Sequence, residues 1–166
     1  MKNSKEYKSL KNQLEDSQVK VNNLQVVNIW KLQRKGEQSK FINRGNEQLL
    51  IHGSRPQNFV GILSRGLLMP KVVTKQGIDR TDEGWLGNGI YFANALCTTL
   101  YYALHNENGT RFAVLSNVSL GKQRTYTEIT YGIQKPPKGY DSCYGISCLN
   151  DEQSDTTFAI CPQIFF

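Results

Sequence analysis

The residues of this chain that could carry chemistry form two short clusters. The first is His52-Gly53-Ser54, at the end of an apolar stretch, where an imidazole can emerge at a cleft and Gly53 lets a ligand approach the backbone. On that context alone, His52 fits a hydrogen-bonded structural histidine as well as a ligand-binding one. The second cluster is Gly87–Ala93, in which two glycines before Tyr91 could open a pocket floor. Tyr91 alone is equally typical of a core residue.

The cysteines do not indicate a metal site. Cys143 and Cys148 with His105 could in principle contribute to a metal site, but their spacing is irregular and a fourth ligand is missing. The four cysteines contain no CxxC pair, and a chain of this length can bury a core without disulfide bonds. We therefore expect free structural thiols and no bound metal.

The net charge of +6 lies entirely at the front of the chain. Residues 1–55 hold 11 Lys or Arg against 5 Asp or Glu, whereas residues 56–166 hold 9 of each. A basic front could contact nucleic acid, but no helix-turn-helix, zinc-finger or RNA-recognition signature accompanies it, so a solvated basic helix is the simpler interpretation. The apolar stretches are too short to cross a bilayer, and the start lacks the apolar core of a signal peptide, so we expect an intracellular protein without membrane contact.

Hydrophobic periodicity predicts alternating helices and strands around these clusters. The predicted helices cover residues 5–17, 56–65 and 94–105, with Asn94 as the cap of the third and Gly66 as the stop of the second. The predicted strands cover residues 24–33, 48–51, 89–93, 111–118, 124–129 and 158–161. A polar segment over residues 70–88 is long enough for a lid, and a loop rich in Pro, Gly and Tyr precedes the last strand.

The two clusters together match the nicotinamide and ribose site of one family. From about Val26 to Phe158 the chain resembles the poly(ADP-ribose) polymerases, including the stretches LLIHGSRPQNFVGILSRGLLMPKVV, LGNGIYFANA and NVSLGK. The stretches RGLLMPKVV, Arg80–Asp82 and Pro136–Ser142 are most similar to the vault-associated branch of that family. Any association with vault-like particles follows from this resemblance alone.

The resemblance implies how NAD⁺, the family's co-substrate, would bind at the first cluster. Gly53 would form backbone hydrogen bonds with the nicotinamide carboxamide. His52 would bond the 2′-hydroxyl of the adenosine ribose, and Ser54 and Asn58 would support the adenosine side.

The resemblance also assigns the second cluster. Tyr102 would stack on nicotinamide and Tyr91 would form the opposite wall of that slot. Thr99 stands where family members usually carry a Ser bonded to the carboxamide, which keeps the hydroxyl and adds a methyl group. Residues 70–88 would be the donor loop over the bound dinucleotide.

The family's catalytic Glu, placed before an aromatic at the start of a late strand, is replaced in this chain. The match of Thr157–Ile160 to that strand puts Thr157 in its place, so the implied catalytic set is His52, Tyr91 and Thr157. Three acids lie nearby, and we interpret them as a solvated loop: Asp151, Glu152 and Asp155. Because relatives without the Glu commonly transfer one unit, single-unit transfer is expected rather than polymer formation.

These observations predict an α+β protein with the ADP-ribosyltransferase fold. We expect two small, mostly antiparallel sheets around an NAD⁺ cleft with flanking helices, an N-terminal helical segment over residues 1–20 and a catalytic domain over residues 21–166. The chain ends at Phe166, where the family continues through another long strand, so we expect the last sheet strand to be missing.

The leading functional hypothesis is transfer of ADP-ribose from NAD⁺ to side chains of protein acceptors, with release of nicotinamide. The alternatives are a catalytically degenerate NAD⁺-binding or interaction domain, motivated by Thr157 and the chain end, and a nucleic-acid module that rests only on the basic front.

Overall fold

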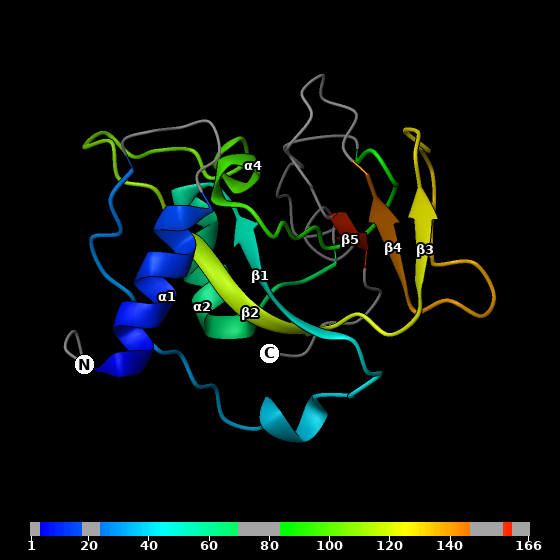
Figure 1. The fold of residues 1–166 in the computed structure, drawn as a ribbon, viewed down its shortest axis with the longest axis horizontal. Coiled ribbons are helices and arrows are strands. Elements are labelled where there is room, and N and C mark those ends of the chain that lie inside the picture. Colours follow the sequence, from blue (N-terminus) through cyan, green and yellow to red (C-terminus); the bar gives the residue numbers. More distant parts are fainter. Residues whose placement is uncertain (1–3, 18–23, 70–83, 147–157, 161–166) are drawn as a thin grey trace.

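A computed structural model describes residues 4–17, 24–69, 84–146 and 158–160, and these contain two small sheets (Figure 1). In the first sheet, β1 (Glu47–Gly53) pairs antiparallel with β2 (Ala113–Ser119). In the second, β4 (Ser142–Gly145) lies between β3 (Gln123–Tyr126) and β5 (Phe158–Ile160). The β3–β4 pair is parallel and the β4–β5 pair is antiparallel. The predicted α+β class is confirmed, with one parallel pair in sheets that are otherwise antiparallel.

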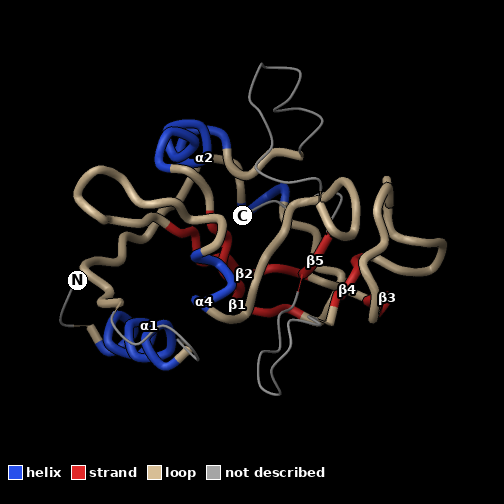
Figure 2. The backbone as a smooth tube through the Cα atoms, turned by 90° about the horizontal axis from the view of Figure 1, so that it is seen from above, coloured by secondary structure: helices blue, strands red, loops and turns tan. Residues whose placement is uncertain are grey.

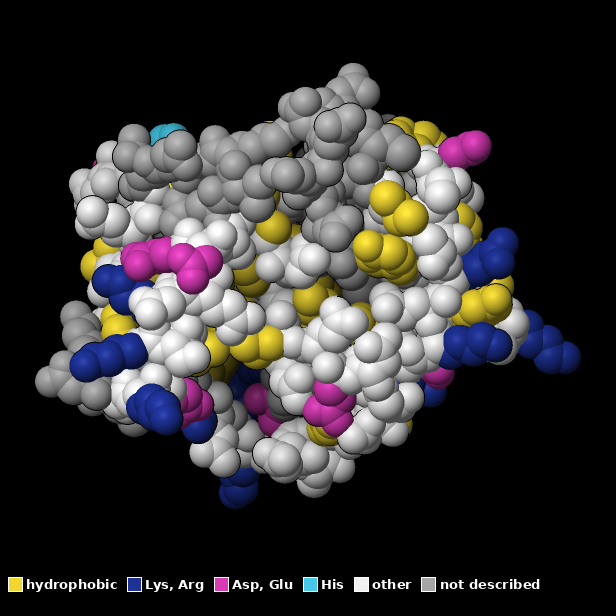
Figure 3. All heavy atoms as spheres, viewed as in Figure 1, with side chains coloured by type: hydrophobic (Ala, Val, Ile, Leu, Met, Phe, Trp, Pro, Cys, Tyr) yellow, Lys and Arg dark blue, Asp and Glu magenta, His cyan; other side chains and the backbone are white. Residues whose placement is uncertain are grey.

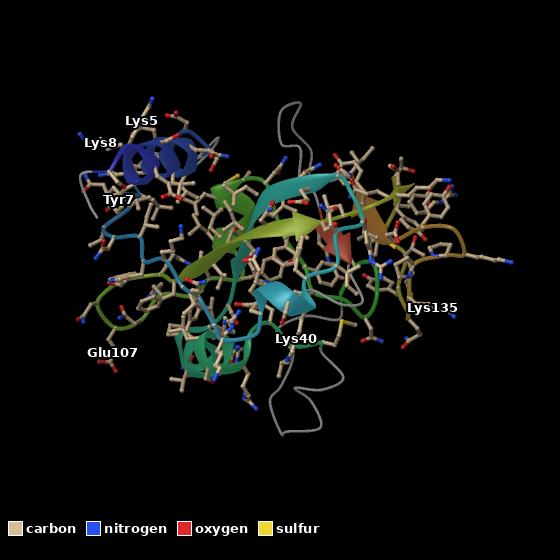
Figure 4. All side chains as sticks on the ribbon, turned by 90° about the horizontal axis from the view of Figure 1, so that it is seen from below. Lys5, Tyr7, Lys8, Lys40, Glu107 and Lys135 are labelled. Atoms are coloured by element: carbon tan, nitrogen blue, oxygen red, sulfur yellow. The ribbon has the colours of Figure 1, made fainter. Side chains whose placement is uncertain are left out.

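Helix α1 (Lys5–Asp16) confirms the first predicted helix. It begins at Ser4, whose hydroxyl accepts a hydrogen bond from the Tyr7 amide at 3.1 Å. None of its twelve residues is fully buried, and Lys5 and Lys8 point away from the body of the molecule (Figure 4). Individual hydrogen bonds connect the helix to the rest of the protein, such as that from the Leu96 amide to the hydroxyl of Ser17, its C-cap residue, at 3.1 Å.

The main core lies between the first sheet and α2 (Phe59–Arg65), which follows the short 3-10 helix η2 (Pro56–Asn58). Gly66 ends α2 with φ of 87°, as the sequence predicts for a C-terminal glycine. Figure 2 shows α1 and α2 on opposite sides of the β1–β2 sheet. The buried side chains that form this core come from both strands, α2 and the segments after them: Leu50, Ile62, Leu67, Ile90, Phe92, Val118 and Leu120.

The two sheets are joined where β2 runs on toward β3. Leu120 is 0% exposed, and its carbonyl accepts a hydrogen bond of 2.7 Å from the buried Ser142 hydroxyl at the start of β4. Asp141 accepts from the Lys122 amide at 3.0 Å and pairs with Arg44 at 3.0 Å. Because these contacts join the start of β4 to the segment before β1 and the segment after β2, they fix how the second sheet is attached to the first.

The predicted strand over residues 24–33 is wrong. The structure describes all of these residues and they form no strand; a turn at Lys35–Glu37 and the 3-10 helix η1 (Gln38–Lys40) follow them. Val27 and Trp30 are 78% and 73% exposed, so their apolar and β-branched character is not used in a sheet. β-propensity reflects packing on a neighbouring strand, and this segment has no such neighbour among the described residues.

Three further differences from the predicted elements bear on the site. Residues 89–93 are not a regular strand, because Ile90 and Ala93 take part only in isolated bridges, that of Ala93 being to Ile51 of β1. The predicted helix over residues 94–105 is reduced to α4 (Leu96–Leu100), which begins after Ala95 rather than Asn94. The third difference is β4, which lies inside the loop expected before the last strand. Its four residues carry too short a pattern to predict, and it exists because β3 and β5 pair with it on both sides.

The surface of the described part is mixed. On the face drawn in Figure 3, Lys and Arg lie mainly at the margins, while hydrophobic side chains gather toward the middle. None of the helices in the described ranges is long and apolar enough to cross a membrane.

The burial of Leu120 between the two sheets predicts that its truncation destabilises the protein. Leu120→Ala should lower the free energy of unfolding by about 2–5 kcal/mol, because it removes a fully buried side chain and leaves a cavity. Thermal denaturation should show Tm lower by roughly 5–15 °C for a chain of this size. Val60→Ala is the matched control, since Val60 is 78% exposed and should change Tm little. Equal Tm values for the two variants would show that Leu120 is not a core residue.

Candidate functional site

The site is assembled where the segment before α4 meets the outer edge of β1. Ile51 and Ala93 exchange two backbone hydrogen bonds of 2.8 Å each, in an antiparallel bridge. This bridge places His52 and Gly53, the next residues of β1, beside Tyr91 and Phe92. The two clusters recognised in the sequence therefore form one site.

His52 is held by this contact in one orientation. Its Nδ1 lies 2.8 Å from the carbonyl oxygen of Tyr91, and its ring packs at a tilt on Phe92 with ring centroids 5.8 Å apart. A carbonyl can only accept, so Nδ1 carries the proton and Nε2 of the neutral ring is left as an acceptor. Burial lowers the pKa of His52, and the bond to Tyr91 opposes this only in part. The half-buried imidazole is therefore kept neutral, with one acceptor nitrogen available to a hydroxyl donor.

Gly53 is required by the close approach of α4. A Cβ at this position would collide with the carbonyl oxygen of Thr99 and lie 2.9 Å from its Cγ2 and 3.0 Å from the Ala103 amide nitrogen. Thr99 is itself buried, and its hydroxyl donates to the Ala95 carbonyl at 3.1 Å. The backbone of β1 and the end of α4 thus lie so close together that no Cβ fits at position 53.

Ser54 and Asn58 are brought together by the turn after β1. Pro56 begins η2, and Asn58 at its end donates from Nδ2 to the Ser54 hydroxyl at 2.9 Å. Both side chains are half-buried. The pair forms a fixed polar edge directly after Gly53, on the side where the resemblance places the adenosine half of NAD⁺.

Tyr91 is fixed at its hydroxyl. This hydroxyl accepts from the Leu86 amide at 3.0 Å and donates to the Gly87 carbonyl at 2.8 Å. Gly87 has φ of 91° and lies directly against the backbone of Ile133, whose carbonyl accepts from the Asn88 amide at 2.7 Å. The turn that holds Tyr91 is therefore itself held by the segment before β4.

A second apolar cluster packs against Tyr91 and Tyr102. Its buried members are Leu86 and Cys143, and its half-buried members include both tyrosines of the expected slot: Trp85, Tyr91, Tyr102, Tyr126 and Ile133. Tyr91 and Tyr102 thus pack on one common base, as two walls of a slot require. Sequence reasoning missed the base, because Cys143 belongs to β4, and missed Ile133; the glycine at position 87 was the only signal of the close contact there.

The remaining candidates have different outcomes. Thr157 and the nearby acids Asp151, Glu152 and Asp155 lie outside the described residues, as do Cys148 and most of the expected donor loop, residues 70–83. Burial raises the pKa of the Cys143 thiol, which disfavours the thiolate that a metal ligand requires. Among the described residues, no three His, Cys, Asp or Glu side chains are grouped as a metal ion needs.

Comparison with known proteins decides the family. The model of the poly(ADP-ribose) polymerase catalytic domain matches residues 4–160. The chain belongs to this family. Members use NAD⁺ as a co-substrate and transfer its ADP-ribose.

Individual relatives agree with this assignment. The chain is 44% identical over 124 residues to the human protein mono-ADP-ribosyltransferase PARP4, covering 74% of this chain and 7% of the relative. It is 36% identical over 152 residues to the poly [ADP-ribose] polymerase of Sarcophaga peregrina, covering 87% of this chain and 15% of the relative. The chain therefore spans only a small part of the length of the curated relatives that it matches.

The close contact at Gly53 predicts an asymmetry between two glycines. Gly53→Ala should lower the free energy of unfolding by about 1–3 kcal/mol, because the added Cβ meets backbone atoms of α4 that cannot move independently. Gly61→Ala is the control, since its Cβ would meet only the end of the Arg65 side chain at 3.2 Å and alanine favours a helix by about 0.5–1 kcal/mol. Urea denaturation compares the two. A Gly53→Ala protein as stable as wild type would contradict the described contact.

The lowered pKa of His52 predicts a pH dependence of stability. As the pH falls through the ordinary value of 6.5, His52 of the unfolded chain takes up a proton, whereas the folded protein does so only at lower pH. The unfolded state then binds more protons than the folded state. The contribution of His52 to the free energy of unfolding is therefore complete above pH 6.5 and decreases below it. In His52→Gln this contribution is absent, and chemical denaturation at several pH values should show a flatter profile between about pH 7.5 and 5.5. Parallel profiles of unfolding free energy against pH for wild type and His52→Gln would exclude a contribution of His52.

Proposed function

We propose that this chain transfers single ADP-ribose units from NAD⁺ to side chains of acceptor proteins and releases nicotinamide. The observation that carries the proposal is the convergence of His52 and Gly53 from β1 with Tyr91 and Tyr102, which share one apolar base. Membership of the polymerase catalytic domain family supplies the reaction class. The name of the human and mouse relatives, protein mono-ADP-ribosyltransferase, supports the single-unit outcome.

The geometry suits the cleavage of a glycosidic bond. The bond between nicotinamide and ribose breaks with its electron pair leaving on the nicotinamide, the ribose becomes cation-like, and the acceptor's nucleophile adds at that carbon and loses a proton. This reaction requires orientation of the dinucleotide more than a strong base. In our proposal the Gly53 backbone and the two tyrosines hold the nicotinamide, and Nε2 of neutral His52 accepts a hydrogen bond from a ribose hydroxyl.

Thr157 is the residue that favours single-unit transfer in this proposal. It directly precedes β5, which pairs with the β4 strand that carries Cys143 at the base of the slot. A threonine hydroxyl has no charge to stabilise the developing cation or to accept a proton from a ribose hydroxyl, which chain elongation needs. A protein nucleophile that is already reactive does not need that help.

One alternative is favoured by the same residue. A domain that binds NAD⁺ without turnover would keep His52, Gly53 and both tyrosines, and would tolerate Thr157 without consequence. Binding of NAD⁺ without release of nicotinamide or modification of any protein distinguishes this alternative.

The decisive experiment is incubation of the purified chain and an acceptor protein mixture with labelled NAD⁺, resolved on a denaturing gel. Wild type should give discrete labelled bands, and His52→Ala and Tyr91→Ala should reduce labelling by about 100-fold or more, because an orientation error on the order of 1 Å carries a cost of that size. Thr157→Glu should convert the bands into a ladder.

The control is Lys40→Ala, a change in the exposed 3-10 helix η1, which should label like wild type. No label and no nicotinamide released by folded wild-type protein would reject the transferase proposal in favour of NAD⁺ binding alone. A ladder formed by wild type would reject single-unit transfer.

A further inference from the structure

Arg111 connects the chain before β2 to the end of α4. Its Nη1 nitrogen donates to two carbonyl oxygens, that of Leu100 at 3.1 Å and that of Ala103 at 2.6 Å. Leu100 is the last residue of α4, and the Leu104 amide that would bond its carbonyl in a longer helix bonds the Tyr102 carbonyl instead, at 3.1 Å. Arg111 therefore satisfies a carbonyl that the early end of the helix leaves open.

The loop of residues 106–110, which is closed by its own hydrogen bonds, places Arg111 beside the end of α4. The Asn106 side chain accepts from the amides of Asn108 and Thr110 at 3.0 and 2.9 Å, and the Asn106 amide donates to the Thr110 carbonyl at 2.9 Å. Gly109 has φ of 75°, which lets the chain reverse within these residues. Figure 4 labels Glu107 at the outer tip of this loop. The loop is fixed by its own bonds, so the residue after Thr110 returns to α4 in a defined position.

The two carbonyls that Arg111 holds flank Tyr102. The turn of residues 101–103 contains this tyrosine, and its amides at Tyr102 and Ala103 both donate to the Thr99 carbonyl, at 3.1 and 2.9 Å. The same Thr99 carbonyl and Ala103 amide face Gly53. The guanidinium thus bonds both ends of the turn that carries one aromatic wall of the slot and meets the backbone of β1.

We propose that Arg111 is a positioning residue that fixes the Tyr102 turn against Gly53 and so sets the width of the nicotinamide slot. The inference rests on the proposed function for the identity of the ligand, but the clamp itself is a property of the fold. Arg111 does not touch the reacting atoms in this proposal. It acts through the backbone position of Tyr102, and its loss widens or loosens the slot without removing any group that contacts NAD⁺.

The chain supplies a matched control in Arg34. Its Nη1 donates to the carbonyls of Ile62 and Leu63, at 2.8 and 3.4 Å, near the end of α2. Arg34 and Arg111 therefore make the same kind of contact with a helix C-terminus, but the end of α2 is remote in sequence from Tyr102. A purely structural role predicts similar behaviour of the two arginines, whereas the proposal predicts a difference at the slot.

The test measures hydrogen exchange and nicotinamide release in Arg111→Ala, Arg111→Lys and Arg34→Ala. In Arg111→Ala the amides of Tyr102 and Ala103 should exchange about tenfold faster, and the KM for NAD⁺ should rise about fivefold with a smaller change in kcat, as expected for the loss of a charged hydrogen bond. Arg111→Lys keeps a donor and should recover part of both. Arg34→Ala should lower Tm and leave exchange at 102–103 and the KM as in wild type.

Several outcomes would overturn the inference. Unchanged exchange at Tyr102 and Ala103 in Arg111→Ala rejects the clamp, and faster exchange with a KM equal to that of Arg34→Ala rejects its effect on the slot. If Arg111→Ala does not fold, amide exchange at Tyr102 and Ala103 and the KM for NAD⁺ are measured in Arg111→Lys instead. Wild type that releases no nicotinamide rejects the proposed function, and exchange at these two amides then decides the clamp alone.

Discussion

The pair of backbone hydrogen bonds between Ile51 and Ala93 is the contact on which the rest of the site depends. It is a single bridge rather than a continued strand pair, so it sets the register of two segments without hiding the residues on either side of it. His52 meets the Tyr91 carbonyl across 39 positions of sequence only because that register is fixed. A slip by one residue would turn His52 to the opposite face of β1, since side chains alternate along a strand.

The second constraint is the absence of side chains at two backbone contacts. Gly53 lets α4 approach β1, and Gly87 lets the turn that binds the Tyr91 hydroxyl lie on Ile133. Both contacts are between backbone atoms, which cannot repack as a flexible side chain can. The positions of Tyr91 and Tyr102 are therefore set by main-chain geometry, and the apolar base under them, with Cys143 at its centre, fills the space that remains.

These constraints explain which parts of the structure the sequence could predict. The strand over residues 48–51, helix α1 and the stop of α2 at Gly66 are marked by local periodicity and caps, and all three are present. Strand β4 and the short α4 depend on partners elsewhere in the chain: β4 on two neighbouring strands, and the end of α4 on the guanidinium of Arg111. The strand predicted over residues 24–33 fails for the opposite reason, because these residues have the composition of a strand but no partner strand among the described residues. The residues expected to bind NAD⁺ were recognised through family motifs rather than periodicity, and their roles remain predictions.

In the proposed function, the groups that orient NAD⁺ are separate from position 157, which would govern the step after cleavage. The residues proposed to orient NAD⁺ lie in two stretches, residues 52–58 and 91–102, which are joined by the Ile51–Ala93 bridge and by the hydrogen bond of His52 to the Tyr91 carbonyl. Thr157 precedes β5, in the other sheet, which is attached to the first by Leu120, Ser142 and the Arg44–Asp141 pair. In our proposal, a Thr in place of the family's Glu at position 157 therefore affects the fate of the bound ADP-ribose rather than the binding of NAD⁺.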